Sequence, residues 1–358
     1  MYPMRLWAVK VSRTSAENTR RLLLETDAIH AHAQIHKDGE DIIIPLKSQP
    51  GTADLEILFN ETSLKDNITI IETEFEPKIH KPTLEDMLGF SPTFDVIGDI
   101  AVMDADEPEA RKVARALMDF RKSLKVVLGA TGPVSGEYRI REFVVLAGEN
   151  RTHTIHTEYG CRYRVDLAKA YFSPRLATER KRVADMVQPG QCVVDLFAGV
   201  GPFSILIGKN VPGSKVVAVD KNPAAVQFLN ENIGLNKLDN ITAVEDDARH
   251  AAEAWKHSAD HVIMNLPHSA IDFIDSGILV AKNGGMVHFY DITPEADLYN
   301  TSWGLITEAA EDMGKKVECF DKRIVRTYAP YQYNVCIEFL VLDLTFKDVV
   351  KNNSKQPT

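Results

Sequence analysis

Two aspartates follow strand-like runs at a spacing that suits a nucleotide-like cofactor. One apolar run ends in Asp195 and leads into a loop carrying Gly199 and Gly201, which lets the backbone approach a ligand at the start of a helix. A second apolar run, residues 215–220, ends in Asp220, whose carboxylate can accept both hydroxyls of a ribose. These features predict a ribose-bearing cofactor, and taken alone they suit a nicotinamide dinucleotide equally well.

The glycine loop departs from the dinucleotide-binding fingerprint. Residues 199–204 read Gly-Val-Gly-Pro-Phe-Ser, so the third small residue that packs the helix in that fingerprint is missing. The departure disfavours a dehydrogenase but leaves that class open. Without further residues, the loop also fits an ordinary tight strand-to-helix turn.

Two more strand-like runs deliver polar groups to the same predicted edge. Residues 241–244 lead to Asp247, whose carboxylate can accept a hydrogen bond from an adenine amino group. Residues 261–264 lead to Asn265-Leu266-Pro267, where an amide and a rigid turn can hold a planar base. Asn beside Pro is also a common turn signal, so the order of all these strand ends is the stronger indication.

The elements that position these residues predict an α/β chain of several domains. A doubly wound sheet domain is expected over residues 169–348, after a helix at 174–187, and it ends in an antiparallel hairpin of 317–325 with 334–342. The remaining expected ranges are an N-terminal α/β module over 1–75, a linker over 76–82, a middle α+β domain over 83–168 and a disordered tail over 349–358. Within these ranges we expect strands at 6–11, 31–36, 41–46 and 96–102, and helices after Ser15, at 84–88 and at 108–124.

Charge indicates where a polyanion would bind. The net charge of −10 over 358 residues argues against nucleic acid as a partner of the whole surface. The segment 162–182 nevertheless holds seven basic residues against two acidic ones, with Arg139 and Arg141 shortly upstream. This run predicts a phosphate-binding surface, and a solvated helix face is the alternative.

No apolar run approaches the length of a membrane span, and residues 1–21 lack a secretory signal, so we expect a cytoplasmic protein without a membrane partner. The cysteines lack the paired spacing of a metal site, and we expect buried reduced thiols at Cys161, Cys192, Cys319 and Cys336. His30, His32 and His36 lie close together without a second ligand cluster, so no metal site is predicted.

Together the motifs resemble one family, the archaeal and eukaryotic-type tRNA (guanine-N1)-methyltransferases that modify the nucleotide 3′ of the anticodon. The resemblance covers nearly the whole chain. It rests on Tyr171-Phe172-Ser173-Pro174-Arg175-Leu176-Ala177-Thr178-Glu179-Arg180, on residues 195–203, on Asn265-Leu266-Pro267 and on Arg326-Thr327-Tyr328-Ala329-Pro330.

The resemblance implies a Rossmann-like class I methyltransferase domain, a middle α+β domain and a small N-terminal α/β domain that recognises tRNA. It implies that the protein binds tRNA and uses S-adenosyl-L-methionine. Nothing in the sequence indicates a dimer helix, so we expect a monomer. The implied cofactor-binding residues are Asp195, Phe197, Gly199, Gly201, Asp220, Lys221, Asp247, Ala248 and Asn265.

The implied reaction requires a base, because guanine N1 carries a proton at neutral pH. The resemblance assigns that role to Glu179, whose surroundings must strengthen it, since a free glutamate side chain, with a pKa of about 4.3, is a weak base. Arg139 is expected to stabilise charge on guanine O6, with Arg141 as a close rival. Asn265 is expected to hold the guanine edge and completes the catalytic set; the substrate-binding set is Arg175, Pro267, Arg141 and Tyr171.

Some assignments stay open. Arg175 lies four residues before Glu179 and could position the base or a phosphate, or form a helix-surface ion pair with Glu179. Tyr171 is one of several aromatic candidates for stacking on a flipped base. Two alternative functions remain: an aminocarboxypropyl transferase of the wyosine pathway, which the motif around Glu179 disfavours, and a non-catalytic RNA-binding module, which the acidic cofactor residues disfavour.

Overall fold

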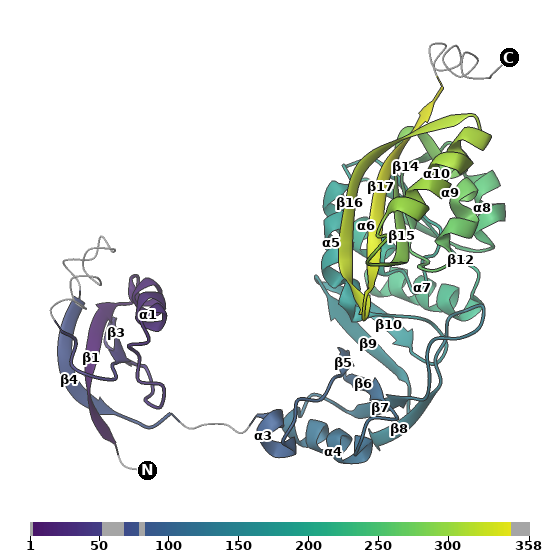
Figure 1. The fold of residues 1–358 in the computed structure, drawn as a ribbon. Helices are drawn as coiled ribbons and strands as arrows, with labels where there is room; N and C mark the ends of the chain where they lie inside the picture. The colour runs from purple at the N-terminus through teal and green to yellow at the C-terminus, as the bar shows by residue number, and fades with distance from the viewer. Residues whose placement is uncertain (1–2, 52–67, 79–82, 345–358) are drawn as a thin grey trace. The chain divides into compact units, whose positions relative to one another are not determined.

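The computed structural model describes residues 3–51, 68–78 and 83–344. Contacts divide the chain into two compact units, Met1–Thr83 and Leu84–Thr358 (Figure 1). The division adjoins the expected linker at 76–82, of which residues 79–82 lie outside the described part, as does the expected tail at 349–358. Residues 83–168 and 169–348, expected as separate domains, fall almost entirely within the second unit.

In its described residues the first unit is a four-stranded antiparallel sheet with the helix α1. The strand order is β2-β3-β1-β4, and Val9, Leu23 and Ile44 lie in the core between the sheet and the helix. Its elements are β1 (Met4–Ser12), α1 (Ala16–Glu25), β2 (His36–Asp38), β3 (Asp41–Pro45) and β4 (Ile68–Phe75). The strand expected at 31–36 is wrong, because Ala33 makes only an isolated bridge to Pro77 and β2 begins at His36.

The second unit begins with a small α+β sheet of order β5-β6-β7-β8, in which only β6 and β7 run parallel. Its elements are α3 (Leu84–Leu88), β5 (Asp95–Ile97), β6 (Ile100–Asp104), α4 (Ala110–Phe120), β7 (Val126–Ala130) and β8 (Phe143–Gly148). The single strand expected at 96–102 is wrong: Gly98, at φ +57°, turns the chain and makes a hairpin of β5 and β6. The helix expected at 108–124 is the shorter α4. A separate antiparallel pair follows, β9 (His153–Glu158) and β10 (Cys161–Asp166).

The large sheet has seven strands in the order β13-β12-β11-β14-β15-β17-β16. The first five are parallel, and β17 is antiparallel to both of its neighbours, which confirms the predicted hairpin and extends it. The strands are β11 (Cys192–Asp195), β12 (Lys215–Asp220), β13 (Ile241–Glu245), β14 (Ala259–Met264), β15 (Ala281–Pro294), β16 (Lys315–Ala329) and β17 (Gln332–Asp343).

Helices cover both faces of this sheet (Figure 1). One core contains Val183, Phe203 and Leu229, and the other contains Ala251, Ile278 and Ile306. The helices are η1 (Pro174–Leu176), α5 (Ala177–Met186), α6 (Pro202–Asn210), α7 (Pro223–Leu235), α8 (Ala248–Ala254), η2 (Ala270–Phe273), α9 (Ile274–Val280) and α10 (Asn300–Asp312). The strand order reverses between β11 and β14, so a ligand crevice is expected at their carboxyl ends. The predicted Rossmann-like fold is confirmed.

The structure also bears on membrane spans, metal sites and the state of the cysteines. No helix in the described part of the chain is long and apolar enough to cross a membrane. Nor do the described His, Cys, Asp and Glu residues form a group that could hold a metal. Cys161 and Cys336 are buried thiols as expected, but Cys192 is only half-buried and Cys319 is exposed, because it lies on the outer strand β16.

Candidate functional site

The loop after β11 is built around a buried carboxylate. Asp195 is 1% exposed, and its Oδ2 accepts a hydrogen bond from the Ser204 hydroxyl at 2.8 Å. Burial raises the pKa of Asp195 to about 7, although hydrogen bonds from Ser204 and the Phe197 N–H oppose the rise. Gly201 begins α6 at φ +87°, where a Cβ would lie 2.4 Å from Leu229 Cδ1. The loop is therefore held by hydrogen bonds to Asp195, and position 201 has no room for a side chain.

Asp220 connects the next strand to this loop. Its Oδ2 accepts the Gly199 N–H at 2.7 Å, and its Oδ1 accepts the Asn222 N–H at 2.8 Å. Burial raises the pKa of Asp220, and the same backbone donors oppose that rise. A Cβ on Gly199 would meet only the Tyr171 carbonyl, at 3.7 Å. Each oxygen of Asp220 keeps a further acceptor position for a ribose hydroxyl beside the glycine loop.

The third strand end supplies Asp247, which caps α8 by accepting the Arg249 N–H at 2.9 Å. The following Ala248 is buried in the core. Lys221, predicted beside the cofactor, extends its ammonium to Glu137 Oε1 at 2.5 Å and lies 3.7 Å from Asp247 Oδ2. Lys221 thus ties the sheet edge to the loop that carries Arg139, a contact that sequence reasoning missed.

Asn265 and Phe197 complete the sheet edge. Asn265 Oδ1 is buried and has no hydrogen-bond partner among the described residues. A buried acceptor of this kind is costly unless a ligand satisfies it. Phe197 packs edge-on against Phe273, with ring centroids 5.2 Å apart. The carboxyl edge therefore combines two half-buried carboxylates, an open glycine loop and an unsatisfied amide oxygen.

A cavity of about 430 Å³ lies beside this edge and collects most of the predicted substrate-binding residues. Among the side chains that line it are Asp95, Arg139, Arg141, Tyr171, Arg175, Arg326 and Tyr328. The run Arg326–Pro330 reaches it from the last hairpin, and His268, next to Pro267, packs edge-on against Tyr328. The cavity is thus the meeting point of the small sheet, the segment before α5 and the end of β16.

The structure distinguishes the two candidate arginines. Arg139 is half-buried and donates a hydrogen bond from Nη2 to the carbonyl of Pro267. Burial lowers the pKa of Arg139, while Tyr171 and Tyr328 oppose that shift. Arg141 lines the same cavity but is exposed. Arg139 is therefore the arginine that reaches the Asn-Leu-Pro motif.

Arg175 does not form the ion pair with Glu179, and its expected role toward the base or a phosphate stays a prediction. It lies in η1 rather than on α5, and its Nε donates to Asp95 Oδ1 at 2.8 Å. The expectation that Arg175 and Glu179 share one helical face is wrong, because the helix proper begins at Ala177.

Glu179 is absent from the described residues that line the cavity. It is 7% exposed, and Arg182 donates to both of its oxygens, at 2.6 and 2.9 Å. The Tyr290 hydroxyl donates to Glu179 Oε1 at 2.7 Å. Sequence reasoning missed both partners, although the three-residue spacing of Glu179 and Arg182 on a helix was a usable signal for the first.

Most members of the basic run 162–182 form ion pairs with carboxylates of the chain itself. Arg180 is 2% exposed and binds both oxygens of Glu158, at 2.6 and 2.8 Å. Five other members of the run, Arg164, Lys169, Arg175, Lys181 and Arg182, pair with carboxylates. Glu158, Glu231 and Asp95 come from other elements, whereas the other carboxylates lie three or four residues from their partners in sequence. Phosphate binding by this run stays a prediction.

Three protein-family models match successive parts of the chain. The tRNA methyltransferase 5 N-terminal domain matches residues 8–54, the TYW2 N-terminal domain matches residues 79–152, and the TRM5/TYW2 methyltransferase domain matches residues 154–318. Trm5b of Pyrococcus abyssi, a tRNA (guanine(37)-N(1))-methyltransferase, is 40% identical over 93% of this chain and 98% of its own length. The chain belongs to this family of tRNA methyltransferases.

Solved structures agree with that membership. The crystal structure of Trm5b from Pyrococcus abyssi matches with a TM-score of 0.70 and 39% identity over 94% of this chain and 99% of that one. The complex of aTrm5 and tRNALeu matches with a TM-score of 0.65 and 33% identity, over 93% and 99%. A tRNA(Phe) (4-demethylwyosine(37)-C(7)) aminocarboxypropyltransferase of Methanocaldococcus jannaschii is 33% identical over 68% of this chain and 96% of its own length. The family resemblance drawn from the motifs is confirmed.

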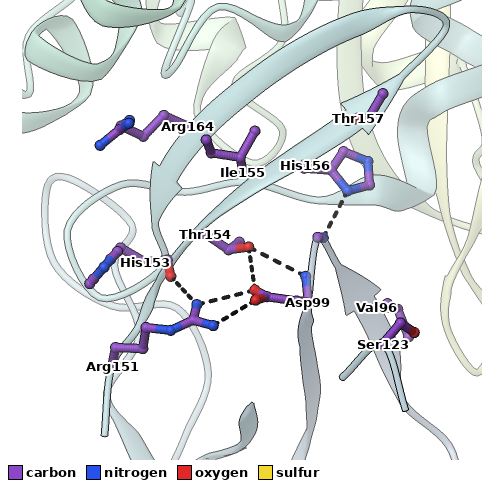
Figure 2. A pocket seen from close by; sticks show the side chains of 11 residues that line it. Val96, Asp99, Ser123, Arg151, His153, Thr154, Ile155, His156, Thr157 and Arg164 are labelled. Atoms are coloured by element: carbon purple, nitrogen blue, oxygen red, sulfur yellow. Dashed lines mark hydrogen bonds and ion pairs between the residues drawn. The ribbon is translucent and has the colours of Figure 1, made fainter. Parts of the chain in front are cut away.

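In this member of the family a second hollow, of about 730 Å³, lies between the β5–β6 turn and strand β9 (Figure 2). Arg151 donates to both oxygens of Asp99, at 2.6 and 3.1 Å, and Thr154 donates to Asp99 Oδ1 at 2.7 Å. His156 Nδ1 accepts the Gly98 N–H at 3.1 Å. These hydrogen bonds connect the small sheet to β9. Because the charged groups Arg151 and Asp99 pair with each other, the hollow offers little free charge to a ligand.

Proposed function

We propose that this protein transfers a methyl group from S-adenosyl-L-methionine to N1 of the guanosine at position 37 of tRNA. The activity for which Trm5b is named, at 40% identity, and the aTrm5–tRNALeu complex support that substrate. The contact between Arg139 and the Pro267 carbonyl carries the proposal, because it joins a nucleoside-binding sheet edge to an arginine-lined cavity.

The sheet edge suits an adenosyl cofactor. Asp220 accepts the ribose hydroxyls, Asp247 accepts the adenine amino group, and the buried Asn265 Oδ1 gains the donor that it lacks among the described residues. When bound, S-adenosyl-L-methionine supplies an electrophilic methyl group on a sulfonium. The protein's part is to align the guanine nitrogen with that methyl group, which needs position rather than a metal ligand set.

Arg139 stabilises the guanine as it loses its N1 proton. The negative charge spreads to O6, and a guanidinium already fixed at Pro267 meets that charge without reorganising. Arg141 and Arg326 line the same cavity, so they are our candidates for the RNA phosphates. Tyr171, 46% exposed at the cavity, is the candidate for stacking on the flipped base.

Glu179 accepts the N1 proton in this proposal. Its buried carboxylate accepts two hydrogen bonds at Oε1 and one at Oε2, from Arg182 and Tyr290, and in this proposal it exchanges one of them for a hydrogen bond from the guanine. Such a rearrangement on substrate binding is common, since hydrogen bonds of catalytic groups often form only in the substrate complex.

The aminocarboxypropyltransferase relative marks the alternative product. The match to that protein covers 96% of its length but only 68% of this chain. About a third of this chain therefore has no counterpart in it. The match of residues 8–54 to the tRNA methyltransferase 5 N-terminal domain favours methylation.

Mass spectrometry of nucleosides from unmodified tRNA incubated with protein and S-adenosyl-L-methionine tests the proposal. We expect a guanosine that gains one methyl group at the position 3′ of the anticodon. An aminocarboxypropyl adduct would instead assign the chain to the wyosine reaction.

The role of Glu179 is tested by Glu179→Ala in single-turnover methylation. Arg182 keeps Glu338 as a partner at 2.8 Å, so the variant is expected to fold and bind cofactor. The rate should fall by about 100- to 10,000-fold, the usual contribution of a general base. Asp185→Ala, an exposed position on the same helix, is the matched control. A Glu179→Ala rate equal to that of the control would remove Glu179 from the mechanism.

A further inference from the structure

A row of buried and half-buried ionisable groups extends from Glu179 across the neighbouring strands β17, β15 and β14. Arg182, which binds Glu179, also places Nη1 2.8 Å from Glu338 Oε1. His288 Nδ1 lies 2.6 Å from the same oxygen, and His288 Nε2 lies 3.0 Å from His261 Nδ1. Glu338 and His288 are direct cross-strand partners on β17 and β15. The strand register therefore places His288 and Glu338 side by side.

These groups occupy core positions that packing alone would fill with apolar side chains. Glu338 is 1% exposed, His288 is 0% exposed and His261 is 6% exposed. Their strand neighbours Val287 and Ile337 are apolar and fully buried. Since a well-packed apolar core is usually at least as stable as a buried ion pair, the row points to a role other than stability.

The row keeps Glu338 charged. Burial alone would raise the pKa of Glu338, but hydrogen bonds from His288 and Arg182 hold it at about 2. Burial and the adjacent His288 ring lower the pKa of His261 to about 4. Glu338 therefore stays ionised at any pH at which the enzyme works, and its Oε2 is buried without a hydrogen-bond partner among the described residues.

We propose that Glu338 is a positioning residue for the general base: it provides Arg182 with a second, permanent carboxylate, so that Glu179 can release that arginine and take a proton. This inference rests on the proposed function and on Glu179 as its base.

The physical reason is the charge left behind when Glu179 becomes protonated. Neutral Glu179 no longer balances Arg182, and a half-buried guanidinium without a counter-ion is disfavoured. Glu338 balances it in both protonation states, so the protein favours proton uptake by Glu179 more than it would without Glu338. His288 and, behind it, His261 hold Glu338 in place for that purpose.

The other ionisable groups around this pair do not provide a competing carboxylate. Tyr290 on β15 donates to Glu179, and Cys336 on β17 lies 3.9 Å from Arg182 Nη2 as a thiol whose pKa burial raises well above its usual value. Arg323 on β16 approaches from the outer strand but is paired with Asp321. Among the described residues that face Arg182, Glu179 and Glu338 are the carboxylates that bind it.

The test compares Glu338→Gln with the double variant Arg182→Gln/Glu338→Gln in the full chain. The single-turnover methylation rate is measured against pH at saturating cofactor and unmodified tRNA, and cofactor affinity is measured by calorimetry. Glu338→Gln leaves Arg182 committed to Glu179, so we expect the rate to fall about tenfold or more and its acid limb to move to lower pH. The double variant removes the unbalanced charge and should be faster than Glu338→Gln. Glu318→Gln, exposed on the adjoining strand β16, is the control.

A double variant no faster than Glu338→Gln, with an unshifted pH profile, would overturn the inference and reduce Glu338 to a structural residue. That result would leave the loss of activity in Glu179→Ala intact, so it is distinct from failure of the proposed function. If loss of cofactor binding shows that Glu338→Gln is unfolded, the pH profile of Glu338→Asp is measured instead. Retained charge should keep the wild-type pH profile, and a displaced profile would contradict the role of charge.

Discussion

Replacement of Asp195 by Asn should change how the stability of the second unit depends on pH. Asp195 is 1% exposed, and burial raises its pKa from 3.8 to about 7. A carboxyl group with a raised pKa in the folded state binds more protons folded than unfolded, so its contribution is fully favourable below the unfolded pKa. This contribution to the free energy of unfolding is therefore lost as the pH rises through the pKa of Asp195 in the folded protein. Asn carries no such proton, can accept the Ser204 hydroxyl through its own oxygen, and removes the loss.

The magnitude follows from the two pKa values. A rise from 3.8 to about 7 corresponds to about 4 kcal/mol when the group is ionised in both states. About half of this change, about 2 kcal/mol, falls between about pH 5.5 and about pH 8. The free energy of unfolding of Asp195→Asn, relative to wild type, should increase by that amount across the interval.

Urea unfolding of cofactor-free protein at the two pH values measures this difference. A Trp7→Phe background leaves fluorescence to Trp255 and Trp303, which both belong to the second unit. Other titrating groups act in both proteins and largely cancel in the comparison. A relative stability that is constant with pH would show that Asp195 is ionised in the fold without penalty, and the account of the loop would be refuted.

Three other changes test the site. Asp220→Ala should weaken cofactor binding about tenfold or more in calorimetry, because it removes a charged acceptor that also holds the Gly199 N–H, and unchanged affinity would exclude a ribose role. Gly201→Ala should lower the free energy of unfolding in urea by about 2 kcal/mol or more, because φ is +87° and the new Cβ meets Leu229 at 2.4 Å. Gly199→Ala, at φ +57° with room for a Cβ, should lower it less, and equal losses would contradict this reasoning. Arg326→Gln should lower tRNA affinity about tenfold with cofactor affinity preserved, because Arg326 lines the cavity and its buried Nε lacks a hydrogen-bond partner among the described residues; equal binding of tRNA would place Arg326 in a structural role.

The parts of the fold that sequence reasoning predicted correctly are those fixed by local pattern. The strand at residues 215–220 and the helix at 84–88 match the structure residue for residue, because their apolar spacing is continuous and their ends carry clear stop signals. The strand expected at 96–102 failed because its apolar run includes Gly98-Asp99, and the left-handed turn at Gly98 divides it. The strand expected at 31–36 failed because its backbone bonds to residues 76–78 instead of forming a longer strand, and those residues are far away in sequence.

The sequence by itself determined which groups stand at the carboxyl ends of the strands. In a parallel sheet those ends share one edge, so Asp195, Asp220 and Asn265 converge once the order of elements is known. The tertiary structure alone decided the partners. Arg139 meets the carbonyl of Pro267 across 128 residues, and Glu179 is held in a row that depends on the pairing of His288 with Glu338. Such contacts arise from strand register and from the docking of separate elements, and residue spacing along the chain encodes neither.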